Sequence, residues 1–519
     1  MLARVMSAAV VGVDARVVEV EVMLAKGFGN FNTVGLPEMS VREGKVRVRA
    51  AIRESELPYP KRAVTVNLAP ADLRKDGTYF DLPIALGLLA CQGAISTESL
   101  DGWVVAGELS LSGEIRPVRG LLPVAEMARN LGHRGVICAA DNAAEVMAVE
   151  GIEVRAAHRL AEVVDGLNSD TWPVLELKTR DVAASQTICW SDVNGQAHAK
   201  RALEVGAAGG HNVVMTGSPG CGKTMLARRI GSILPPLQPQ QALEVSKIYS
   251  VAGLLQPGTG LVRDRPFRAP HHTGSASSLV GGGSNPRPGE VSLAHHGVLF
   301  LDELPEFPRA VLETLRQPIE DGLVTIARAR HVVQFPSRTM LVAALNPCPC
   351  GYMGSKVRAC VCSDAQVRRY ASRLSGPLLD RIDVQIELEP LPAAQLRTVG
   401  DGDTSAAVRE RVVRARQRQR RRYALENGNW TNATAPMPQL RRLAPLASSV
   451  HDVLLAAIEK FGLSPRAHDR IWRVAASVAD LAASEEIRVE HVAEALGYRH
   501  FDQPADGPGS RTQSPFSGR

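Results

Sequence analysis

The sequence predicts an α/β fold built around a parallel sheet, and three apolar runs that each end in chemically active residues predict it. The runs occupy residues 213–215, 298–301 and 340–345, and their continuous apolar character is typical of buried parallel strands. A glycine-rich loop and a helix-like segment follow the first run, two carboxylates follow the second, and an amide follows the third. Because the carboxyl ends of parallel strands meet at one edge of a sheet, we expect these groups to converge there.

The glycine-rich loop, residues 217–224, matches the complete pattern G-x-x-x-x-G-K-[ST] of a phosphate-binding loop. Its glycines let several backbone N–H groups and a helix N-terminus face one polyphosphate, Lys223 supplies a positive charge, and Thr224 offers a hydroxyl to Mg²⁺. We therefore predict ATP and Mg²⁺ as cofactors. The predicted nucleotide contacts are Gly217, Ser218, Pro219, Gly220, Cys221, Gly222, Lys223, Thr224 and Asp302.

Two carboxylates and an amide supply the rest of an ATP-hydrolysing site. Asp302 can hold Mg²⁺ through water and Glu303 can polarise the attacking water, although such a pair can also cap the next helix. This succession of motifs resembles the AAA+ family of ATPases, and the resemblance implies that Asn346 helps to orient the water beside the γ-phosphate. Taken alone, Asn346 would be interpreted as a turn residue before Pro347.

Composition favours a cytoplasmic protein of several domains. The chain has 519 residues and contains no run of about 18 apolar residues, the length that crosses a membrane. Asp14 and Glu19 interrupt the N-terminal segment too early for a secretory signal peptide. The 60 basic and 54 acidic side chains give a net charge of +6, which permits a polyanionic partner without requiring one.

Changes in composition divide the chain into five segments. Residues 1–166 alternate Val-rich and Ala/Leu-rich runs, 167–190 form a polar linker, 191–390 hold the ATPase core, 391–500 indicate a helical lid, and 501–519 indicate a disordered tail. Inside the core, the glycine-rich stretch 281–289 and a hairpin at 324–335 look like insertions.

The inserted hairpin resembles the pre-sensor hairpin of one AAA+ clade, whose ring architecture points it at a central pore. Its tip carries Arg328, Arg330 and His331, which we predict to contact DNA. At the tip of an ordinary hairpin, these side chains would only aid solubility.

Four of the eight cysteines cluster after the third strand in two C-x-C pairs: Cys348, Cys350, Cys360 and Cys362. A disulfide framework is not expected in the cytoplasm. Four thiolates can bind Zn²⁺, although C-x₂-C is the usual spacing and the shorter one strains chelation by both members of a pair. Zinc ligation and packing as reduced cysteines are the two interpretations.

Several longer segments resemble one family, the YifB/ComM proteins, which are magnesium chelatase-like AAA+ ATPases. The resemblance covers about residues 1–500 and rests on FRAPHH at 267–272, PGE at 288–290, LFLDELPEF at 299–307, NPCPCG at 346–351 and SGPLLDRID at 375–383. It implies a homo-hexameric ring in which Arg381, or alternatively Arg373, reaches the γ-phosphate held by the neighbouring subunit. It also implies a sensor 2 role for Arg466, whose alternative is a solvated position on a helix.

The N-terminal domain resembles the proteolytic domain of Lon protease, a ribosomal S5 domain 2-like fold, through segments 74–79 and 107–122. Tyr79 stands where the resemblance places the nucleophilic serine, and Leu122 and Val124 stand where it places the lysine. A serine–lysine dyad needs both groups within hydrogen-bond reach, so we predict a noncatalytic domain that serves assembly or binds a protein partner. The fold class is then α/β: an AAA+ P-loop core with a helical lid, preceded by a Lon-protease-like domain.

The resemblance implies a DNA motor with helicase or branch-migration activity in recombination or natural transformation. A basic helix supports contact with DNA through Arg418, Arg420, Arg421 and Arg422, unless these side chains form only a solvated face. The alternative function is a chelatase-type or protein-remodelling ATPase that acts on a protein partner. It would share every nucleotide-binding residue, and only the Lon-like domain and the basic helix would distinguish the two. A protease is not expected without the dyad.

Overall fold

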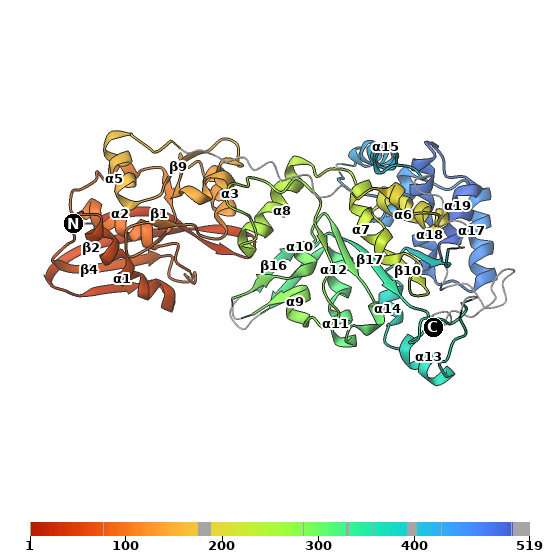
Figure 1. The fold of residues 1–519 in the computed structure, drawn as a ribbon. Helices are drawn as coiled ribbons and strands as arrows, with labels where there is room; N and C mark the ends of the chain where they lie inside the picture. Colours follow the sequence, from red (N-terminus) through yellow and green to blue (C-terminus); the bar gives the residue numbers. More distant parts are fainter. Residues whose placement is uncertain are drawn as a thin grey trace.

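The computed structural model describes residues 2–75, 77–174, 188–283, 285–327, 332–355, 358–391, 402–426, 428–499 and 501. The molecule is elongated, with the N-terminal domain at one end, the ATPase core in the middle and the helical lid at the other end (Figure 1). None of the described helices is long and apolar enough to cross a membrane.

The N-terminal domain is built on a mixed sheet of seven strands. Its elements are β1 (Leu2–Val11), β2 (Asp14–Phe28), β3 (Phe31–Val34), α1 (Met39–Glu54), β4 (Arg62–Ala69), α2 (Asp81–Cys91), β5 (Trp103–Val105), β6 (Glu108–Leu109), β7 (Ile115–Arg116), α3 (Leu121–Asn130), β8 (Gly135–Ala139), α4 (Ala143–Met147), β9 (Glu153–Ala157) and α5 (Leu160–Ser169). The strand order is β3-β4-β2-β1-β5-β8-β9. Val18, Val20 and Val22 of β2 are fully buried at alternate positions, and every residue of α2 is buried beneath the sheet's apolar face.

The ATPase core contains a five-stranded sheet in which all neighbouring strands are parallel. Its elements are α6 (Ala197–Gly209), β10 (Val213–Gly217), α7 (Lys223–Ile233), α8 (Pro239–Ala252), β11 (Phe267–Arg268), α9 (Ala276–Val280), β12 (Gly281–Gly282), β13 (Arg287–Pro288), α10 (Glu290–Leu293), β14 (Val298–Leu301), α11 (Arg309–Thr314), α12 (Arg316–Asp321), β15 (Leu323–Ala327), β16 (Val332–Pro336), β17 (Met340–Leu345), α13 (Asp364–Ala371), α14 (Gly376–Leu379) and β18 (Val384–Leu388). The strand order is β11-β14-β17-β10-β18, so the connections place β11, β14 and β17 on one side of β10 and β18 on its other side. Ligands of open parallel sheets bind at the carboxyl ends of the strands beside such a change of side.

The predicted hairpin is confirmed as β15 and β16, and it packs against the N-terminal domain. Phe335 of β16 is fully buried in a small apolar cluster to which Val11 and Val13 of the first hairpin contribute. On the neighbouring helix α8, Lys247 pairs with Glu126 of α3 at 2.6 Å. The N-terminal domain therefore contacts two parts of the core, the hairpin and α8.

Within its described residues, 402–426 and 428–499, the lid contains five helices: α15 (Ser405–Ala424), α16 (Met437–Leu443), α17 (Ser448–Phe461), α18 (Pro465–Leu481) and α19 (Val489–Gly497). Asp383, directly before β18, joins the lid to the core because it pairs with Arg470 of α18 and with His211. His211 also contacts Ser477 of α18 at 2.8 Å. The pKa of the buried Asp383 carboxyl is lowered, since Arg470 and His211 outweigh the opposing effect of burial.

Three predicted domain boundaries differ from those in the structure. Helix α5 continues to Ser169 and Trp172 packs on the same core, so the N-terminal domain extends beyond residue 166. Trp190, at the end of the predicted linker, is buried in the core shared by the ATPase sheet and the lid. Phe501 is buried as well, so the predicted tail cannot begin there. Residues 502–519 and the linker residues 175–187 lie outside the described residues.

Candidate nucleotide-binding site

The phosphate-binding loop connects the carboxyl end of β10 to the N-terminus of α7. Gly220 and Gly222 adopt φ values of +82° and +99°, in the left-handed region that favours glycine. A Cβ atom on Gly217 would lie 2.6 Å from the carbonyl oxygen of Leu388 in the neighbouring strand β18, so no larger residue fits at position 217. The loop can therefore fold back in front of the helix N-terminus, where backbone N–H groups attract anions.

Lys223 lies between the carbonyls of its own loop and Asn346. Its Nζ donates to the carbonyl oxygens of Gly217 at 2.5 Å and Ser218 at 3.1 Å, and to Asn346 Oδ1 at 3.1 Å. The pKa of Lys223 is lowered, and burial is the largest cause. The structure thus brings the lysine of the loop and the amide at the end of β17 to the same place, as the strand order requires.

Thr224 and Asp302 form the pair predicted to hold Mg²⁺. Thr224 Oγ1 donates to Asp302 Oδ2 at 2.7 Å. The hydroxyl comes from the first turn of α7 and the carboxylate from the end of β14, two strands away from β10 in the sheet. Hydroxyl and carboxylate oxygens are ligands that Mg²⁺ accepts, so the two groups can share one ion directly or through its water.

Glu303 follows Asp302 in a left-handed conformation with φ of +52°, which is unusual for a residue other than glycine. Its side chain is 54% exposed, and its Oε2 lies 3.6 Å from Nδ1 of His272. The ring of His272 in turn lies 4.2 Å from that of His271. Neither histidine was predicted to belong to the site, because nothing in the FRAPHH segment at 267–272 indicates that the chain returns to the acidic strand end.

A cavity of about 410 Å³ lies between the segment that precedes α6 and the start of α15. Residues 193–195 form part of its wall. The adjacent Gln196 donates from Nε2 to the carbonyl oxygen of Cys221 at 3.1 Å and to that of Glu389 at 2.7 Å. The Gln196 side chain thus connects the cavity wall to the phosphate loop. Sequence reasoning missed Gln196, which no motif marks.

Arg381, predicted to act on a neighbouring subunit, and Arg466, predicted as the sensor 2 arginine, lie at the opposite end of the sheet from the phosphate loop. Arg381 precedes β18, whose first residue pairs with the first residue of β10, whereas the phosphate loop follows the last residue of β10. Arg381 pairs with Glu320, and Arg466 Nη1 lies 3.5 Å from Asp380 Oδ2. Five residues of strand span about 16 Å, so neither arginine lies beside the phosphate loop of its own chain.

Arg373, the alternative to Arg381, lies on the other side of the core. It donates to the carbonyl oxygen of Pro305 at 3.1 Å and pairs with Glu306 at 2.7 Å. Both partners belong to the turn that follows Glu303. Arg373 is thus beside the acidic strand end of its own chain, and the action of Arg381 or Arg373 on the next subunit stays a prediction.

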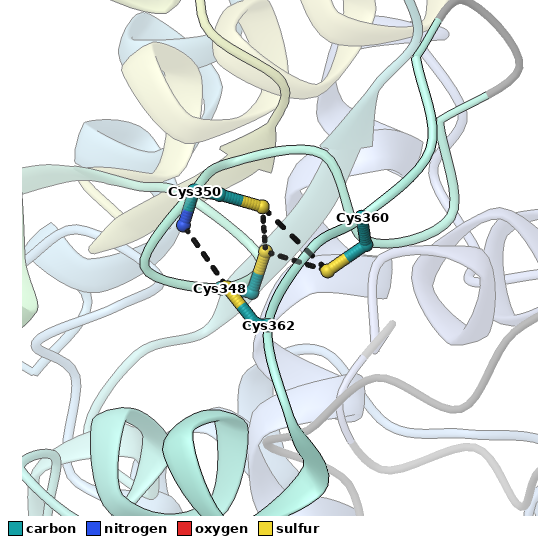
Figure 2. A group of neighbouring side chains, drawn as sticks. All are labelled: Cys348, Cys350, Cys360 and Cys362. Carbon is teal, nitrogen blue, oxygen red and sulfur yellow. Dashed lines mark hydrogen bonds between the residues drawn. The ribbon is translucent and has the colours of Figure 1, made fainter.

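The four cysteines converge on one point (Figure 2). The Sγ atoms of Cys348 and Cys350 lie 3.4 Å apart, and that of Cys360 lies 3.6 Å from each. Cys362 Sγ accepts the backbone N–H of Cys350, and all four sulfurs lie within 4.8 Å of one another. Sulfurs around a tetrahedral zinc ion with bonds of about 2.3 Å are about 3.8 Å apart. The donor set fits zinc, and the short C-x-C spacing does not prevent both members of a pair from facing the ion.

A second group, Glu244 with His295 and His296, also gathers possible metal ligands. Its hydrogen bonds indicate a structural role instead. His295 Nδ1 accepts the backbone N–H of Arg338, so the proton of a neutral ring is on Nε2, which donates to Glu244 at 3.1 Å. That leaves His295 no free lone pair for an ion.

The basic helix α15 uses most of its arginines inside the protein. Arg422 pairs with the buried Asp480 of α18, and Arg418 donates to the carbonyl oxygen of Ser484 at 2.8 Å. These contacts argue against the predicted DNA role at Arg418 and Arg422, because neither guanidinium is free. Arg420 and Arg421 are exposed, so for them the role stays a prediction. The predicted tip residues Arg328, Arg330 and His331 lie outside the described residues.

The residues at the position of the missing dyad in the N-terminal domain make ordinary packing and hydrogen-bond contacts. Leu122 and Val124 are fully buried in α3 within an apolar cluster. The hydroxyl of Tyr79 donates to the carbonyl oxygen of Arg119. These three positions supply neither a base nor an activated nucleophile.

Comparisons with known proteins agree with this geometry. Three family models match in succession: "Subunit ChlI of Mg-chelatase" over residues 20–142, "Magnesium chelatase, subunit ChlI" over 189–396, and "Magnesium chelatase, subunit ChlI C-terminal" over 402–499. The chain is also 26% identical over 164 residues to Lon protease 2 of Bacillus subtilis, which covers 28% of this chain and 29% of that protein.

Two relatives match along nearly the whole length. Competence protein ComM of Haemophilus influenzae is 44% identical over 507 residues, which cover 96% of this chain and 97% of that protein. The YifB protein of Escherichia coli K12 is 43% identical over 497 residues, covering 95% and 96% of the two chains. The chain therefore belongs to the ComM/YifB family of magnesium chelatase-like AAA+ ATPases.

Proposed function

We propose that the protein is an ATP-hydrolysing DNA motor that works in the cytoplasm as a ring of six copies. The observation that carries the proposal is the position of Arg381 and Arg466 at the end of the sheet opposite the phosphate loop. We infer that the arginine which stabilises charge on the γ-phosphate is Arg381 of the next subunit. A closed ring supplies every site in this way.

Each group of the site has a separate task in the proposed reaction. Lys223 neutralises phosphate charge, while Thr224 and Asp302 hold Mg²⁺. Glu303 accepts a proton from the attacking water, and Asn346 orients that water. When bound, Mg²⁺ supplies the positive charge that offsets the charge developing on the phosphate oxygens.

Work on DNA is supported by the relative named for competence and by the exposed arginines of α15. ATPase assays of the full chain with single-stranded, duplex and branched DNA test it. We expect DNA to stimulate hydrolysis, and the stimulation to weaken as salt rises because phosphate contacts release counterions. Hydrolysis that no DNA changes at low salt would reject the motor.

The alternative is a chelatase-type or protein-remodelling ATPase, which the names of the three matching family models favour. It would hydrolyse ATP with the same residues, and its stimulant would be a protein bound through the N-terminal domain. DNA and a copurifying protein, compared as stimulants in one assay, separate the two functions.

We also propose that Cys348, Cys350, Cys360 and Cys362 bind one zinc ion per chain. The cluster touches the nucleotide site, since a Cβ on the adjacent Gly351 would lie 2.6 Å from Pro219 of the phosphate loop. Metal analysis of protein purified without chelator should find zinc, and Cys350→Ser should lose it and weaken ATP binding. Cys138→Ser, at a buried cysteine of the N-terminal domain, is the control. Zinc-free wild-type protein would leave the cysteines as packing residues.

A further inference from the structure

A cavity of about 340 Å³ opens at the end of the ATPase sheet opposite the nucleotide site. The base of the β15–β16 hairpin, the start of β17 and helix α15 form its walls. Four arginines line it: Arg265, Arg338, Arg416 and Arg420. They come from three separate parts of the sequence, so only the fold brings their charges together.

Two of these arginines are fixed by neutral acceptors. Arg416 donates from Nε and Nη2 to the carbonyl oxygen of Ala207, at 3.2 and 2.9 Å, and Arg265 donates to the carbonyl oxygens of Pro235 and His296. Burial lowers the pKa of Arg416 to about 9 and that of Arg265 to about 10, and repulsion from neighbouring arginines of the cavity adds to both effects. Positive charge is thus held in place without a counter-charge.

The other two arginines, Arg338 and Arg420, have exposed side chains at the edge of the cavity. Arg420 Nη1 donates to the side-chain oxygen of Gln238 at 2.7 Å in the amide orientation that satisfies both groups. The stem of Arg338 lies over Gly322 at the base of the hairpin, where a Cβ would be 2.8 Å from Arg338 Cγ. Two carboxylates, Glu320 and Asp321, are on the same wall, and Glu320 is paired with Arg381. Asp321 is exposed, so the four arginines still outnumber the acidic groups of the cavity.

Across the part of the chain that the structure describes, none of the four arginines has a carboxylate within ion-pair distance. Like charges gathered in this way cost free energy unless an anion compensates them. Guanidinium groups are planar and match phosphate oxygens through paired hydrogen bonds. The cavity therefore has the chemistry of a phosphate site.

The rim adds groups that suit a strand better than a free ion. Trp430 offers an aromatic ring, and Thr431 and Thr434 offer hydroxyls. A positive groove combined with aromatic side chains is how proteins bind single strands without sequence preference. We propose that this cavity holds a backbone phosphate of a nucleic-acid strand at the base of the hairpin; the inference rests on the proposed DNA motor.

Binding of a fluorescently labelled oligo-dT strand to the full chain tests the inference. The double variant Arg338→Gln/Arg420→Gln changes only exposed side chains, so the fold should be kept. We expect its Kd to rise about tenfold, and the slope of log affinity against log salt to flatten by about 0.7 for each lost phosphate contact. Arg368→Gln/Arg369→Gln removes the same charge at two exposed positions of α13, outside the cavity and outside α15, and should bind like the wild type. Hydrolysis without DNA should be unchanged in both.

The outcomes separate the two proposals. A wild-type chain that binds no DNA would reject the motor and this inference together. A wild-type chain that binds DNA, with a double variant of equal affinity and salt slope, would reject the cavity alone. Loss of pyrophosphate binding without a change in DNA affinity would assign the cavity to a free phosphate instead. A double variant that changes only the size of the assembly in sedimentation would make the cavity a contact between subunits.

Discussion

The carboxyl and amino ends of the ATPase sheet differ in whether the side chains of one chain already form a site there. At the carboxyl end, Lys223 contacts Asn346 and Thr224 contacts Asp302, so the groups that bind a nucleotide already meet. At the amino end, Arg381 is held by Glu320, which is 60% exposed, and the neighbouring cavity is lined by arginines whose bonds go to neutral acceptors. The difference agrees with the proposal that one chain binds ATP, whereas hydrolysis and movement along DNA need other molecules at the amino end.

The largest expected effect belongs to Arg381. Arg381→Ala should lower kcat for ATP hydrolysis by about 10³–10⁵ while leaving ATP affinity nearly unchanged, because the residue acts on the phosphate of another chain. Steady-state hydrolysis and equilibrium binding of a fluorescent ATP analogue measure the two quantities. Arg373→Ala is the matched control and should lose less activity. An equal loss of kcat in Arg381→Ala and Arg373→Ala would contradict the proposed difference between the two ends of the sheet.

A substitution at Glu303 tests the proposed chemistry at the carboxyl end of the sheet without changing the amino end. Glu303→Gln should still bind ATP but lower kcat by about 10²–10⁴, the usual contribution of a general base. Size-exclusion chromatography with ATP should show the assembled ring, since the nucleotide is not consumed. Turnover at the wild-type rate would remove Glu303 from its role and would point to His272 or another group near the water.

Substitution of Lys223 should weaken ATP binding more than it slows the hydrolysis step. Lys223→Ala should weaken ATP binding roughly 10- to 100-fold, because a hydrogen bond to a charged group contributes about 1.5–3 kcal/mol. Calorimetric titration measures the change, and Arg228→Ala, an exposed position on the same helix, is the control. An unchanged ATP affinity in Lys223→Ala would show that the nucleotide binds elsewhere.

The smallest effect is expected in the N-terminal domain. Tyr79→Phe removes the hydrogen bond to the Arg119 carbonyl and should lower the free energy of unfolding by about 0.5–1.5 kcal/mol, with ATP hydrolysis unchanged. Urea denaturation measures this. Tyr79→Ser should gain no peptidase activity because Leu122 and Val124 supply no base. Cleavage of a casein substrate by that variant would overturn the noncatalytic assignment.

The carboxyl end of the sheet could be predicted from sequence because its signals are local. Buried parallel strands give continuous apolar runs, and the phosphate loop requires glycines at fixed spacing. The strand runs at 213–215, 298–301 and 340–345 accordingly correspond to β10, β14 and β17. Gln196 and His272 could not be found in this way, since they join the site only through loops that return to it.

The arginines of α15 show where such reasoning fails. Their spacing indicates a basic face, but the partner of Arg422 is Asp480 on a different helix, and that of Arg418 is a backbone carbonyl. Pairing between helices depends on packing, which a charge pattern in one helix cannot reveal. The same packing placed Arg416 and Arg420 beside Arg265 and created a cavity that the sequence did not indicate.

The central claim, that each hydrolytic site is made by two chains, is tested most directly by mixing two inactive variants. Lys223→Ala lacks the lysine of its own site but carries Arg381, whereas Arg381→Ala keeps its own loop and lacks the arginine for its neighbour. If each site is shared, a mixture allowed to exchange subunits should regain ATP hydrolysis well above the sum of the separate proteins. A mixture no more active than that sum, with exchange verified by a label, would contradict it.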